Sequence, residues 1–446
     1  MSVSLETLVS LAKRRGFVFQ ASEIYGGISG FYDYGPYGVE LANNLKDLWW
    51  KAFVHEVPNI YGLDTSIIQH PKLWEASGHV AGFSDPIIED VKTKKRYRAD
   101  HLAGVDSTDL AELATALKDK KSPDGNPLSE PRYFNMMLKT HIGAAEDSST
   151  LNYLRPETAG GIYVQYENVR ETMRAKIPFG IAQIGKAFRN EISPRDWLFR
   201  VRELEQMEMQ YFVSPARRDE EYENLRKFTM DFLAKRVGLK GLKWHEHDEK
   251  ERAHYASAAH DIYFDFPIGA KELAGVHNRT DFDLKNHQTA SGKDLEYYDQ
   301  EKNEKFLPNV IESSLGVGRL FTAVLAQAYT EEDVKGEQRV VLKLNPKLTP
   351  VKVAVLPLSK NDKLIPLARK IYTELQKLSV NIEYDETQSI GKRYRRQDEI
   401  GTPYCVTIDF ESLEDNSVTV RDRDSMKQER VKIKEVVEKI KKSLIT

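Results

Sequence analysis

The feature of this sequence that most constrains its fold is a pair of polar strands around one turn. Residues 185–191 read as a strand, residues 192–196 as a polar turn, and residues 200–212 as a second, antiparallel strand. Side chains two apart on a strand point to the same face, so Arg189 and Glu191 are predicted to share one. A guanidinium forks onto phosphate oxygens and a carboxylate accepts hydrogen bonds from amines, so this pair suits a nucleotide. Taken alone, an Arg-x-Glu pair is more often an exposed cross-strand ion pair.

The bulk composition is that of a folded, water-soluble protein. The 446 residues allow two or three domains, and hydrophobic and charged fractions of 40% and 30% argue against extensive disorder. The net charge of −3 means that any contact with RNA depends on local basic patches. The single cysteine, Cys405, excludes an intrachain disulfide and a cysteine-rich zinc site, and we expect it to be a small buried hydrophobe. Without a signal-like N-terminus or an apolar stretch of ~18 residues, the protein is predicted to be cytoplasmic, with no membrane partner.

Changes in composition along the chain predict its domain organisation. Residues 1–91 are expected to begin a catalytic domain, and the charged, turn-rich residues 92–147 to form an insertion outside its sheet. Residues 148–344 are expected to complete that domain, with a second charged insertion at about 215–258. Strands and helices alternate in residues 345–446, which predicts a separate α/β domain with a largely parallel sheet.

A second motif, residues 311–319, ends in Gly-Val-Gly-Arg before an apolar helix. Gly316 and Gly318 would let the backbone approach a ligand, and Arg319 could lie over an adenine ring by cation–π stacking. The third motif is the helix that Pro36 opens, a pattern that an ordinary core helix would also show. In chain order, this helix, the paired strands and the glycine–arginine turn resemble motifs 1, 2 and 3 of the class II aminoacyl-tRNA synthetases.

Four further segments are similar to the homodimeric glycyl-tRNA synthetase family within that class: residues 32–36, 154–159, 272–284 and 390–403. The resemblance covers nearly the whole chain apart from the two insertions. It implies an α+β fold, with an antiparallel sheet flanked by helices, followed by an α/β anticodon-binding domain. It also implies a homodimer that activates glycine with ATP to glycyl-adenylate and transfers it to the 3′ end of tRNA(Gly).

The resemblance assigns the ATP contacts to residues of these motifs. Arg189 is expected at the α-phosphate and the amino-acid carboxylate, Glu191 at the adenine amine and Arg319 over the ring, and these three are the predicted catalytic residues. Arg200 and Arg279 are expected at the outer phosphates and the motif 2 loop. The predicted ATP site is completed by Leu204, Glu272, Gly316 and Gly318.

One position departs from the family pattern. Class II motif 2 normally has phenylalanine four residues after Arg200, stacked on the adenine, where this chain has Leu204. Leucine can still pack against the base but lacks the aromatic contribution. Phe212 is a candidate to replace it.

The glycine pocket is predicted to be acidic. Glycine has no side chain, so the pocket must recognise its ammonium and exclude anything larger. The resemblance places Glu157, Glu208 and Glu312 around the ammonium, with Arg189 and Ser314 as further contacts. Carboxylates crowded around the α-carbon leave no room for a methyl group, which makes an editing site unnecessary. Outside these motifs, each glutamate would be assigned to the solvated surface.

Two possible metal sites follow from the sequence. Joining two anions, glycine and ATP, calls for cations, so Mg²⁺ is expected, with Glu272 and Glu312 among its oxygen ligands. The sequence His-Glu-His-Asp at 245–248 would put two histidines on one face of a strand. No third ligand is evident, so a solvated loop is favoured there and no zinc is expected.

The C-terminal domain carries a basic run on a predicted helix. Lys392, Arg393, Tyr394, Arg395 and Arg396 combine cations with an aromatic ring, as recognition of unpaired RNA bases requires, and they are the predicted anticodon contacts. Without the domain context, a solvated helix face would be favoured.

The sequence also allows two alternative functions. One is a synthetase-like accessory subunit that binds nucleic acid without catalysis, which the intact Arg189, Glu191 and Arg319 argue against. The other is a related synthetase for threonine, proline or histidine. The acidic pocket without zinc ligands disfavours threonine, and the family-specific segments disfavour proline and histidine.

Overall fold

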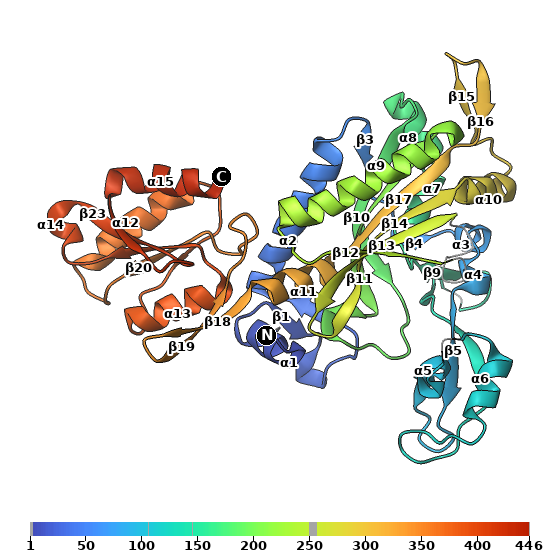
Figure 1. Ribbon diagram of the computed structural model, residues 1–446, viewed down its shortest axis with the longest axis horizontal. Coiled ribbons are helices and arrows are strands. Elements are labelled where there is room, and N and C mark those ends of the chain that lie inside the picture. The colour runs from blue at the N-terminus through green and yellow to red at the C-terminus, as the bar shows by residue number, and fades with distance from the viewer. Residues whose placement is uncertain (1–2, 106, 145, 249–256, 446) are drawn as a thin grey trace.

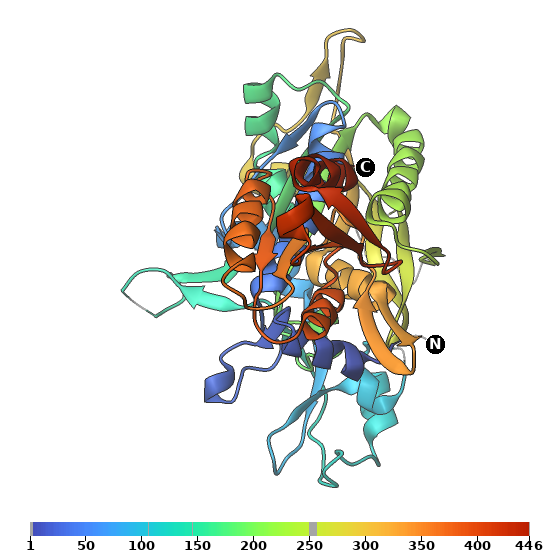
Figure 2. The same ribbon diagram turned by 90° about the vertical axis from the view of Figure 1, so that its left-hand side faces the viewer.

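The computed structural model describes residues 3–105, 107–144, 146–248 and 257–445. A large N-terminal lobe is built around one sheet, and a smaller C-terminal α/β domain lies at one end of the molecule (Figures 1 and 2). The predicted α+β architecture is confirmed. Within the described residues, no helix is both long and apolar enough to cross a lipid bilayer.

The central sheet of the N-terminal lobe has seven strands in the order β12-β13-β14-β17-β11-β10-β3. Every neighbouring pair is antiparallel except β10 and β3, which are parallel. The strands are β3 (Ile60–Gly62), β10 (Phe179–Phe188), β11 (Glu203–Val213), β12 (Lys243–Glu246), β13 (Ala258–Phe266), β14 (Gly269–Thr280) and β17 (Asn309–Gly316).

The two faces of this sheet differ because successive side chains on a strand point in opposite directions. On β11, Met207 and Met209 turn into the main apolar core, whereas Glu208 and Gln210 turn to the other face. The first face packs against α1 (Leu5–Arg14), α2 (Pro36–Trp50), α9 (Arg218–Asp231) and α11 (Val317–Ala328). One end of the other face packs against α7 (Ala159–Val164), α8 (Tyr166–Met173) and α10 (Phe282–Ser291), so the polar cleft lies over the rest of it.

The predicted motif 1 helix is α2, which begins at Pro36 and continues beyond Trp50 as a π-helical turn, Lys51–His55. Proline suits the first turn because its missing N–H would have no helical partner there. Leu41, Leu45 and Trp49 are buried along one side of α2 in the main core.

The predicted second insertion at 215–258 is wrong in its described part, because that segment belongs to the central sheet. α9 packs on β14 and β17, and β12 is the edge strand. Tyr222 and Leu225 of α9 are buried in the main core, while its charged residues lie mostly at the surface. The high charge of this segment reflects the solvent side of one amphipathic helix.

The first predicted insertion corresponds to a small module with its own core, although it starts earlier, at Ser84. Ile88, Leu113 and Leu117 are buried in that core. The module consists of β5 (Ser84–Glu89), β6 (Arg96–Arg98), β7 (Arg132–Asn135), α5 (Ala99–Ala103) and α6 (Leu110–Leu117). It projects from the N-terminal lobe in Figure 1.

Shorter elements complete the N-terminal lobe. β8, β9 and β4 form a three-stranded sheet beside the small module, and β15 and β16 form a hairpin that projects from the lobe (Figure 1). These elements are β1 (Val18–Gln20), β2 (Tyr32–Tyr34), β4 (Ile68–Gln69), α3 (Pro71–Ala76), α4 (His79–Gly82), β8 (Lys139–His141), β9 (Leu151–Leu154), β15 (Tyr297–Asp299) and β16 (Glu304–Phe306).

The C-terminal domain has a five-stranded sheet in the order β21-β20-β22-β23-β24. The sheet was predicted to be largely parallel, but this holds for only part of it. β20 is parallel to its neighbours β21 and β22, whereas β23 is antiparallel to its neighbours β22 and β24. Cys405 on β22 is buried, as predicted. The elements are β20 (Val353–Pro357), α12 (Leu364–Gln376), β21 (Ile382–Tyr384), α13 (Ile390–Ile400), β22 (Tyr404–Ile408), α14 (Ser412–Asp415), β23 (Ser417–Asp422), β24 (Gln428–Lys432) and α15 (Ile433–Ile445).

Helix α13 joins the two lobes through ion pairs. Its Glu399 accepts hydrogen bonds from Arg14 and Arg15 at the end of α1, at 3.0 and 2.5 Å. Its Asp398 accepts from Arg339 at 2.8 Å, and both of these side chains are buried. Arg339 lies on the connecting hairpin of β18 (Tyr329–Val334) and β19 (Glu337–Leu342), so this hairpin is anchored to the C-terminal domain.

Candidate active site

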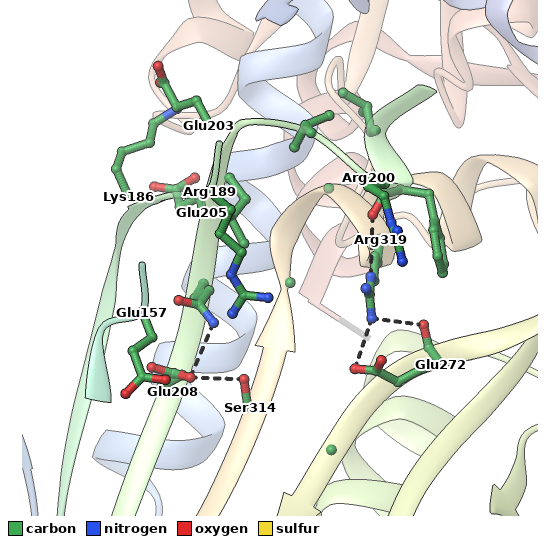
Figure 3. Close-up of a pocket in the computed structure, with 18 of the residues that line it drawn as sticks. Glu157, Lys186, Arg189, Arg200, Glu203, Glu205, Glu208, Glu272, Ser314 and Arg319 are labelled. Atoms are coloured by element: carbon green, nitrogen blue, oxygen red, sulfur yellow. Dashed lines mark hydrogen bonds and ion pairs between the residues drawn. The ribbon is translucent and has the colours of Figure 1, made fainter. Parts of the chain in front are cut away.

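A polar cleft opens over the central sheet, on the face opposite the main core (Figure 3). Its floor follows from the register of three strands. Glu208 on β11 lies opposite Ser314 on β17, and Gln210 lies opposite Glu312. His277 on β14 lies opposite Glu312 from the other side. Residues far apart in sequence therefore meet on one face.

Glu312 is held by three donors at the deep end of this cleft. Its Oε1 faces Nδ1 of His277 at 3.0 Å, and its Oε2 accepts from Arg279 Nη1 at 3.0 Å and from Gln210 Nε2 at 2.9 Å. Burial opposes the charge of Glu312, but Arg279 and His277 outweigh it and lower the pKa of this carboxyl to about 2. Glu312 is therefore ionised at neutral pH.

Arg279 occupies a different place from the one predicted. Its guanidinium is buried and donates two hydrogen bonds to Asp283, at 2.8 and 2.9 Å, in addition to the bond with Glu312. The register between β14 and β17 shifts between Asn278 and Thr280, and such a bulge redirects the side chain at that position. The prediction of an outer-phosphate contact is therefore wrong, because Arg279 lies under the acidic end of the cleft.

Among the described residues, the groups that donate hydrogen bonds to Glu208 are neutral. Glu208 accepts from the hydroxyl of Thr158, from Ser314 Oγ at 3.1 Å and from Gln206 Nε2 at 3.2 Å. Burial, together with the charges of Glu312 and Glu157, raises the pKa of Glu208 to about 7. At neutral pH this carboxyl is thus poised between its two protonation states.

Glu157, Glu208 and Glu312 form an acidic group, and the resemblance predicted that these three carboxylates lie together. The Glu157 carboxylate lies 3.5 Å from Nε2 of His79 on α4. Burial raises its pKa, but His79 and then Arg279 more than offset that, so the pKa of Glu157 is lowered. The four residues predicted around a substrate ammonium, Glu157, Glu208, Glu312 and Ser314, all line the cleft, and Figure 3 shows Glu157, Glu208 and Ser314 together at one end of it.

Arg189 and Glu191 both line the cleft, but they do not share a strand face as predicted. Strand β10 ends at Phe188, and the amide of Glu191 donates to the carbonyl of Arg189 at 2.7 Å, so the chain turns there. Arg189 donates from Nε to the carbonyl of Pro156 at 3.1 Å. In Figure 3 its guanidinium lies beside the acidic group, toward the open part of the cleft.

Arg319 lies across the cleft from the acidic group (Figure 3). Its Nη1 lies 2.8 Å from the Glu272 carboxylate, and its Cζ lies 4.4 Å from the centre of the Phe199 ring. Gly318 packs close behind, where a Cβ atom would lie 2.9 Å from the Leu198 carbonyl oxygen. A glycine is therefore required at that position for Arg319 to reach the cleft.

The expectation that Phe212 replaces the missing aromatic of motif 2 is wrong. Phe212 lies at the far end of β11, opposite Phe179. Its ring is buried, and the centres of the two rings are 5.2 Å apart. Leu204 does line the cleft, as does Phe199, one residue before Arg200 in the turn. Phe199 is therefore one of the aromatic rings that line this cleft, together with Tyr32 and Tyr34.

The small module has a sheet of its own outside the central sheet, but its root lies close enough to the cleft for its charges to act there. Arg98 donates to Asp85 at 2.7 Å. Burial raises the pKa of Asp85, Arg98 opposes that, and the charge of Glu191 raises it further. Charged residues of the module therefore act on the side of the cleft formed by Glu191 and Arg200.

Several residues of the cleft were missed in the sequence. His277, Gln210, Thr158 and His79 all contact the acidic group, and Phe199 contacts Arg319. Strict alternation along β11 and β14 would have pointed to Gln210 and His277. Nothing in the local sequence marks His79, which arrives from another part of the chain.

The two carboxylates predicted to bind Mg²⁺ have other partners in the described structure. Glu312 is bonded to two cationic residues and an amide, and Glu272 pairs with Arg319. Within the described residues, no group of three or more His, Cys, Asp or Glu is arranged to hold a metal. The favoured solvated loop at 245–248 is also wrong, because His245 lies on β12 and Nε2 of His247 lies 2.7 Å from Asp261.

The basic run on α13 is divided between buried and exposed residues. Arg393 is buried and donates to the carbonyls of Pro357, Leu358 and Asp385, which explains its charge without RNA. Tyr394 is hydrogen-bonded to Thr407 at 2.6 Å, and Arg396 to Asp385. Lys392 and Arg395 remain at the surface, where a groove is lined by Lys392, Tyr394, Arg395, Arg396, Arg421 and Arg15.

Comparison with known proteins places these features in a family. Residues 144–328 match the tRNA synthetase class II core domain (G, H, P, S and T), and residues 352–443 match the anticodon binding domain. The chain is 51% identical to the glycine–tRNA ligase of Treponema denticola, over 98% of this chain and 97% of that protein. It is 50% identical to the glycine–tRNA ligase of Macrococcus caseolyticus, over 97% of both chains. The prolyl-tRNA synthetase of Cryptosporidium parvum, complexed with L-proline and AMP, shares the fold with a TM-score of 0.67 at 16% identity, over 99% of this chain and 75% of that one.

Proposed function

The chain belongs to the glycine–tRNA ligase family, a family of class II aminoacyl-tRNA ligases, and on this basis we propose how the cleft carries out the reaction. The enzyme activates glycine with ATP to glycyl-adenylate and transfers the glycyl group to the 3′ end of tRNA(Gly). One observation carries the assignment of the cleft: a single cleft has buried carboxylates at one end and arginines beside an aromatic ring at the other.

Adenylate formation brings two anions together. A glycine carboxylate oxygen attacks the α-phosphorus of ATP, a new O–P bond forms, and the bond to the β-phosphate oxygen breaks as pyrophosphate leaves. The negative charge that builds up at the α-phosphate requires cations held in place beforehand. Arg189 lies between the two ends, so it is the residue proposed to contact both the α-phosphate and the glycine carboxylate.

The glycine ammonium is proposed to bind the acidic group of Glu157, Glu208 and Glu312. Ser314 donates to Glu208 and keeps that carboxylate turned into the cleft. An amino acid with a β-carbon would have to displace one of these carboxylates from its partners. Exclusion of this kind discriminates more strongly than an unfilled pocket does.

The nucleotide is proposed to occupy the other end, with its adenine between Leu204 and the Arg319 guanidinium and its amine near Glu191. Gly316 and Gly318 form the turn that precedes Arg319, and Arg200, which also lines the cleft, is proposed to contact the outer phosphates. Mg²⁺ bound to the phosphates would neutralise the leaving pyrophosphate. Mg²⁺ commonly takes one or two carboxylates plus substrate phosphates, and Glu272, whose side chain is 44% exposed, fits that part better than the buried Glu312.

The partners are proposed from the family. The C-terminal domain would bind the anticodon of tRNA(Gly), with Lys392 as the exposed cation of α13 and Arg395 as a partly buried one, 3.6 Å from Glu337. Two copies would associate through the region of α2, and the enzyme would act in the cytoplasm.

Amino-acid-dependent exchange between ATP and pyrophosphate tests this proposal. The protein is assayed with Mg²⁺ and glycine, alanine, serine, threonine or proline in parallel, followed by charging of tRNA(Gly). Exchange with glycine alone is expected. Comparable exchange with alanine would contradict the acidic exclusion, and no exchange from a folded protein would favour a nucleic-acid-binding accessory subunit.

A further inference from the structure

The proposed glycine site depends on one carboxylate, Glu312, whose orientation is set by residues that the reaction does not touch. A carboxylate has about four acceptor positions on its two oxygens. Contacts among the described residues fill three of them: Arg279 and Gln210 occupy Oε2, and His277 faces Oε1. The fourth position, on Oε1, is the one left for a substrate ammonium.

His277 is in turn held by a second carboxylate. Its Nδ1 lies 3.0 Å from Glu312, and its Nε2 lies 3.4 Å from Oδ1 of Asp261 on β13. Carboxylate oxygens of ionised groups only accept hydrogen bonds, so both ring nitrogens must carry protons, and the ring must be an imidazolium. Asp261 is anchored on its outer side by Nε2 of His247, at 2.7 Å.

The backbone is shaped to admit this ring. Gly275 lies two residues before His277 on the same face of β14. A Cβ atom at Gly275 would lie 2.9 Å from Nε2 of His277 and 3.2 Å from Asp261. A side chain at position 275 would therefore push the imidazole away from Asp261.

We propose that His277 is a positioning residue for glycine recognition: as an imidazolium held by Asp261, it keeps Glu312 ionised and turns Oε1 toward the substrate ammonium. This inference rests on the proposed function of the cleft and adds a residue to it. The electrostatics agree with the geometry. Burial alone would lower the pKa of His277, but Asp261 and Glu312 outweigh it and raise this pKa to about 10.

The charge on His277 also answers a problem of the acidic pocket. Three carboxylates converge there, and like charges at short range favour protonation of at least one of them. The groups that face His277 are Asp261 from β13 and Glu312 from β17, with Arg279 on its own strand and His247 beyond Asp261. His277 and Arg279 together lower the pKa of Glu312 and keep it ionised. Glu208 is instead the carboxyl of this group whose pKa is raised.

The test compares glycine and ATP kinetics in the exchange assay of the full-length protein. His277→Leu removes the imidazolium, and the Michaelis constant (KM) for glycine is expected to rise about 10- to 100-fold, as for one lost charge-assisted hydrogen bond. The KM for ATP is expected to stay within about 3-fold. His260→Gln is the matched control: His260 is a buried histidine next to Asp261 on β13, but it bonds to Tyr222 on the opposite face, so glycine KM should not change.

A second variant separates the charge from a purely structural role and does not require His277→Leu to fold. Asp261→Asn keeps the shape but removes the anion that holds the proton on His277. The ratio of variant to wild-type glycine KM is expected to grow from near 1 at pH 6 to about 10 or more at pH 8.5, as the imidazolium is lost.

The inference is overturned if this ratio is independent of pH, or if His277→Leu raises both KM values equally. A wild-type enzyme that shows no glycine-dependent exchange would instead contradict the proposed function. The two failures are therefore distinguishable.

Discussion

At the glycine end of the cleft, side chains on neighbouring strands hold the carboxylates, whereas at the nucleotide end the arginines contact carbonyl groups, a ring and one half-exposed ion pair. Glu312 has partners on two adjacent strands, and the Arg279 side chain is only 2% exposed. Arg319 is 26% exposed and pairs with Glu272, which is 44% exposed. The two ends differ in how much of their structure exists before the substrates arrive.

This difference follows from the substrates. Glycine is small and offers no side chain, so its pocket must be rigid to exclude others, and buried networks with every member bonded provide rigidity. ATP is large and carries several charges, so residues that can exchange a weak intramolecular partner for the ligand suffice. Exposed ion pairs contribute little to stability and are easily replaced. We therefore expect changes at the glycine end to affect folding and catalysis together, and changes at the nucleotide end to affect catalysis alone.

The largest effect is expected for Arg279→Ala. This change leaves Glu312 and Asp283 buried without their main cation, and breaking such a pair costs about 3–5 kcal/mol. The free energy of unfolding should fall by that amount, and exchange should be lost as well. Urea denaturation followed by circular dichroism measures the first and the exchange assay the second. Wild-type stability would show that the glycine end is not preformed.

The matched change is Arg189→Ala, at the arginine that lies between the two ends and is proposed to contact the α-phosphate. Among the described residues, the Arg189 side chain donates one hydrogen bond, to the Pro156 carbonyl, so the free energy of unfolding should change by less than about 1 kcal/mol. The exchange rate should fall about 1,000-fold, because the developing charge at the α-phosphate loses a preorganised donor. Near-normal exchange would remove Arg189 from the proposed mechanism. A loss of stability as large as in Arg279→Ala would remove the distinction between the two ends.

The same comparison shows how far sequence reasoning reaches. Glu208 and Ser314 could be placed because they lie within motifs that resemble those of the family, and the pairing of β11 with β17 puts them opposite each other. The partners of those residues could not, because they depend on register. His277 and Glu312 meet only because β14 pairs with β17 in one particular alignment.

The errors have equally specific causes. The inward turn of Arg279 depends on a bulge that no spacing rule reveals, and the burial of Arg393 depends on carbonyls at the ends of two other elements. Charge was misread in α9, where a solvated helix face concealed a buried one that includes Tyr222. A high content of charged residues shows that one side of a segment is exposed to solvent. It does not show whether the other side packs against the central sheet.

A smaller effect is expected on pH dependence. The pKa of Glu208 is raised to about 7, mainly by burial and then by Glu312 and Glu157, so this carboxyl is protonated below that pH. The glycine ammonium binds the ionised form, so glycine KM should fall as pH rises to about 7 and then level off. Between pH 8.5 and pH 5.5 the change should be about 30-fold, from one titrating group with a pKa near 7. The KM for ATP over the same range is the internal reference.

Glu208→Gln sharpens that measurement. The amide cannot titrate, so glycine KM in this variant should be raised but constant with pH. A slope that persists in the variant would assign the pH dependence to another group. The pH dependence of the free energy of unfolding gives an independent check. Folding raises the pKa of Glu208, so this carboxyl favours the folded state at low pH, and that contribution is lost as pH rises from about 4.5 to 7.

The smallest effect is expected for Leu204→Phe, which adds an aromatic ring to the nucleotide end. Leu204 lines the cleft at the position where the family pattern places phenylalanine, and Phe212 is too deeply buried to take its place. An aromatic stacking partner contributes about 0.5–1.5 kcal/mol, so the KM for ATP should fall about 2- to 10-fold. Glycine KM and the free energy of unfolding should stay unchanged, because this end adjusts to its ligand. A loss of stability would mean that Leu204 is packed as tightly as the glycine end, and an unchanged KM for ATP would mean that Phe199 and Arg319 already hold the base.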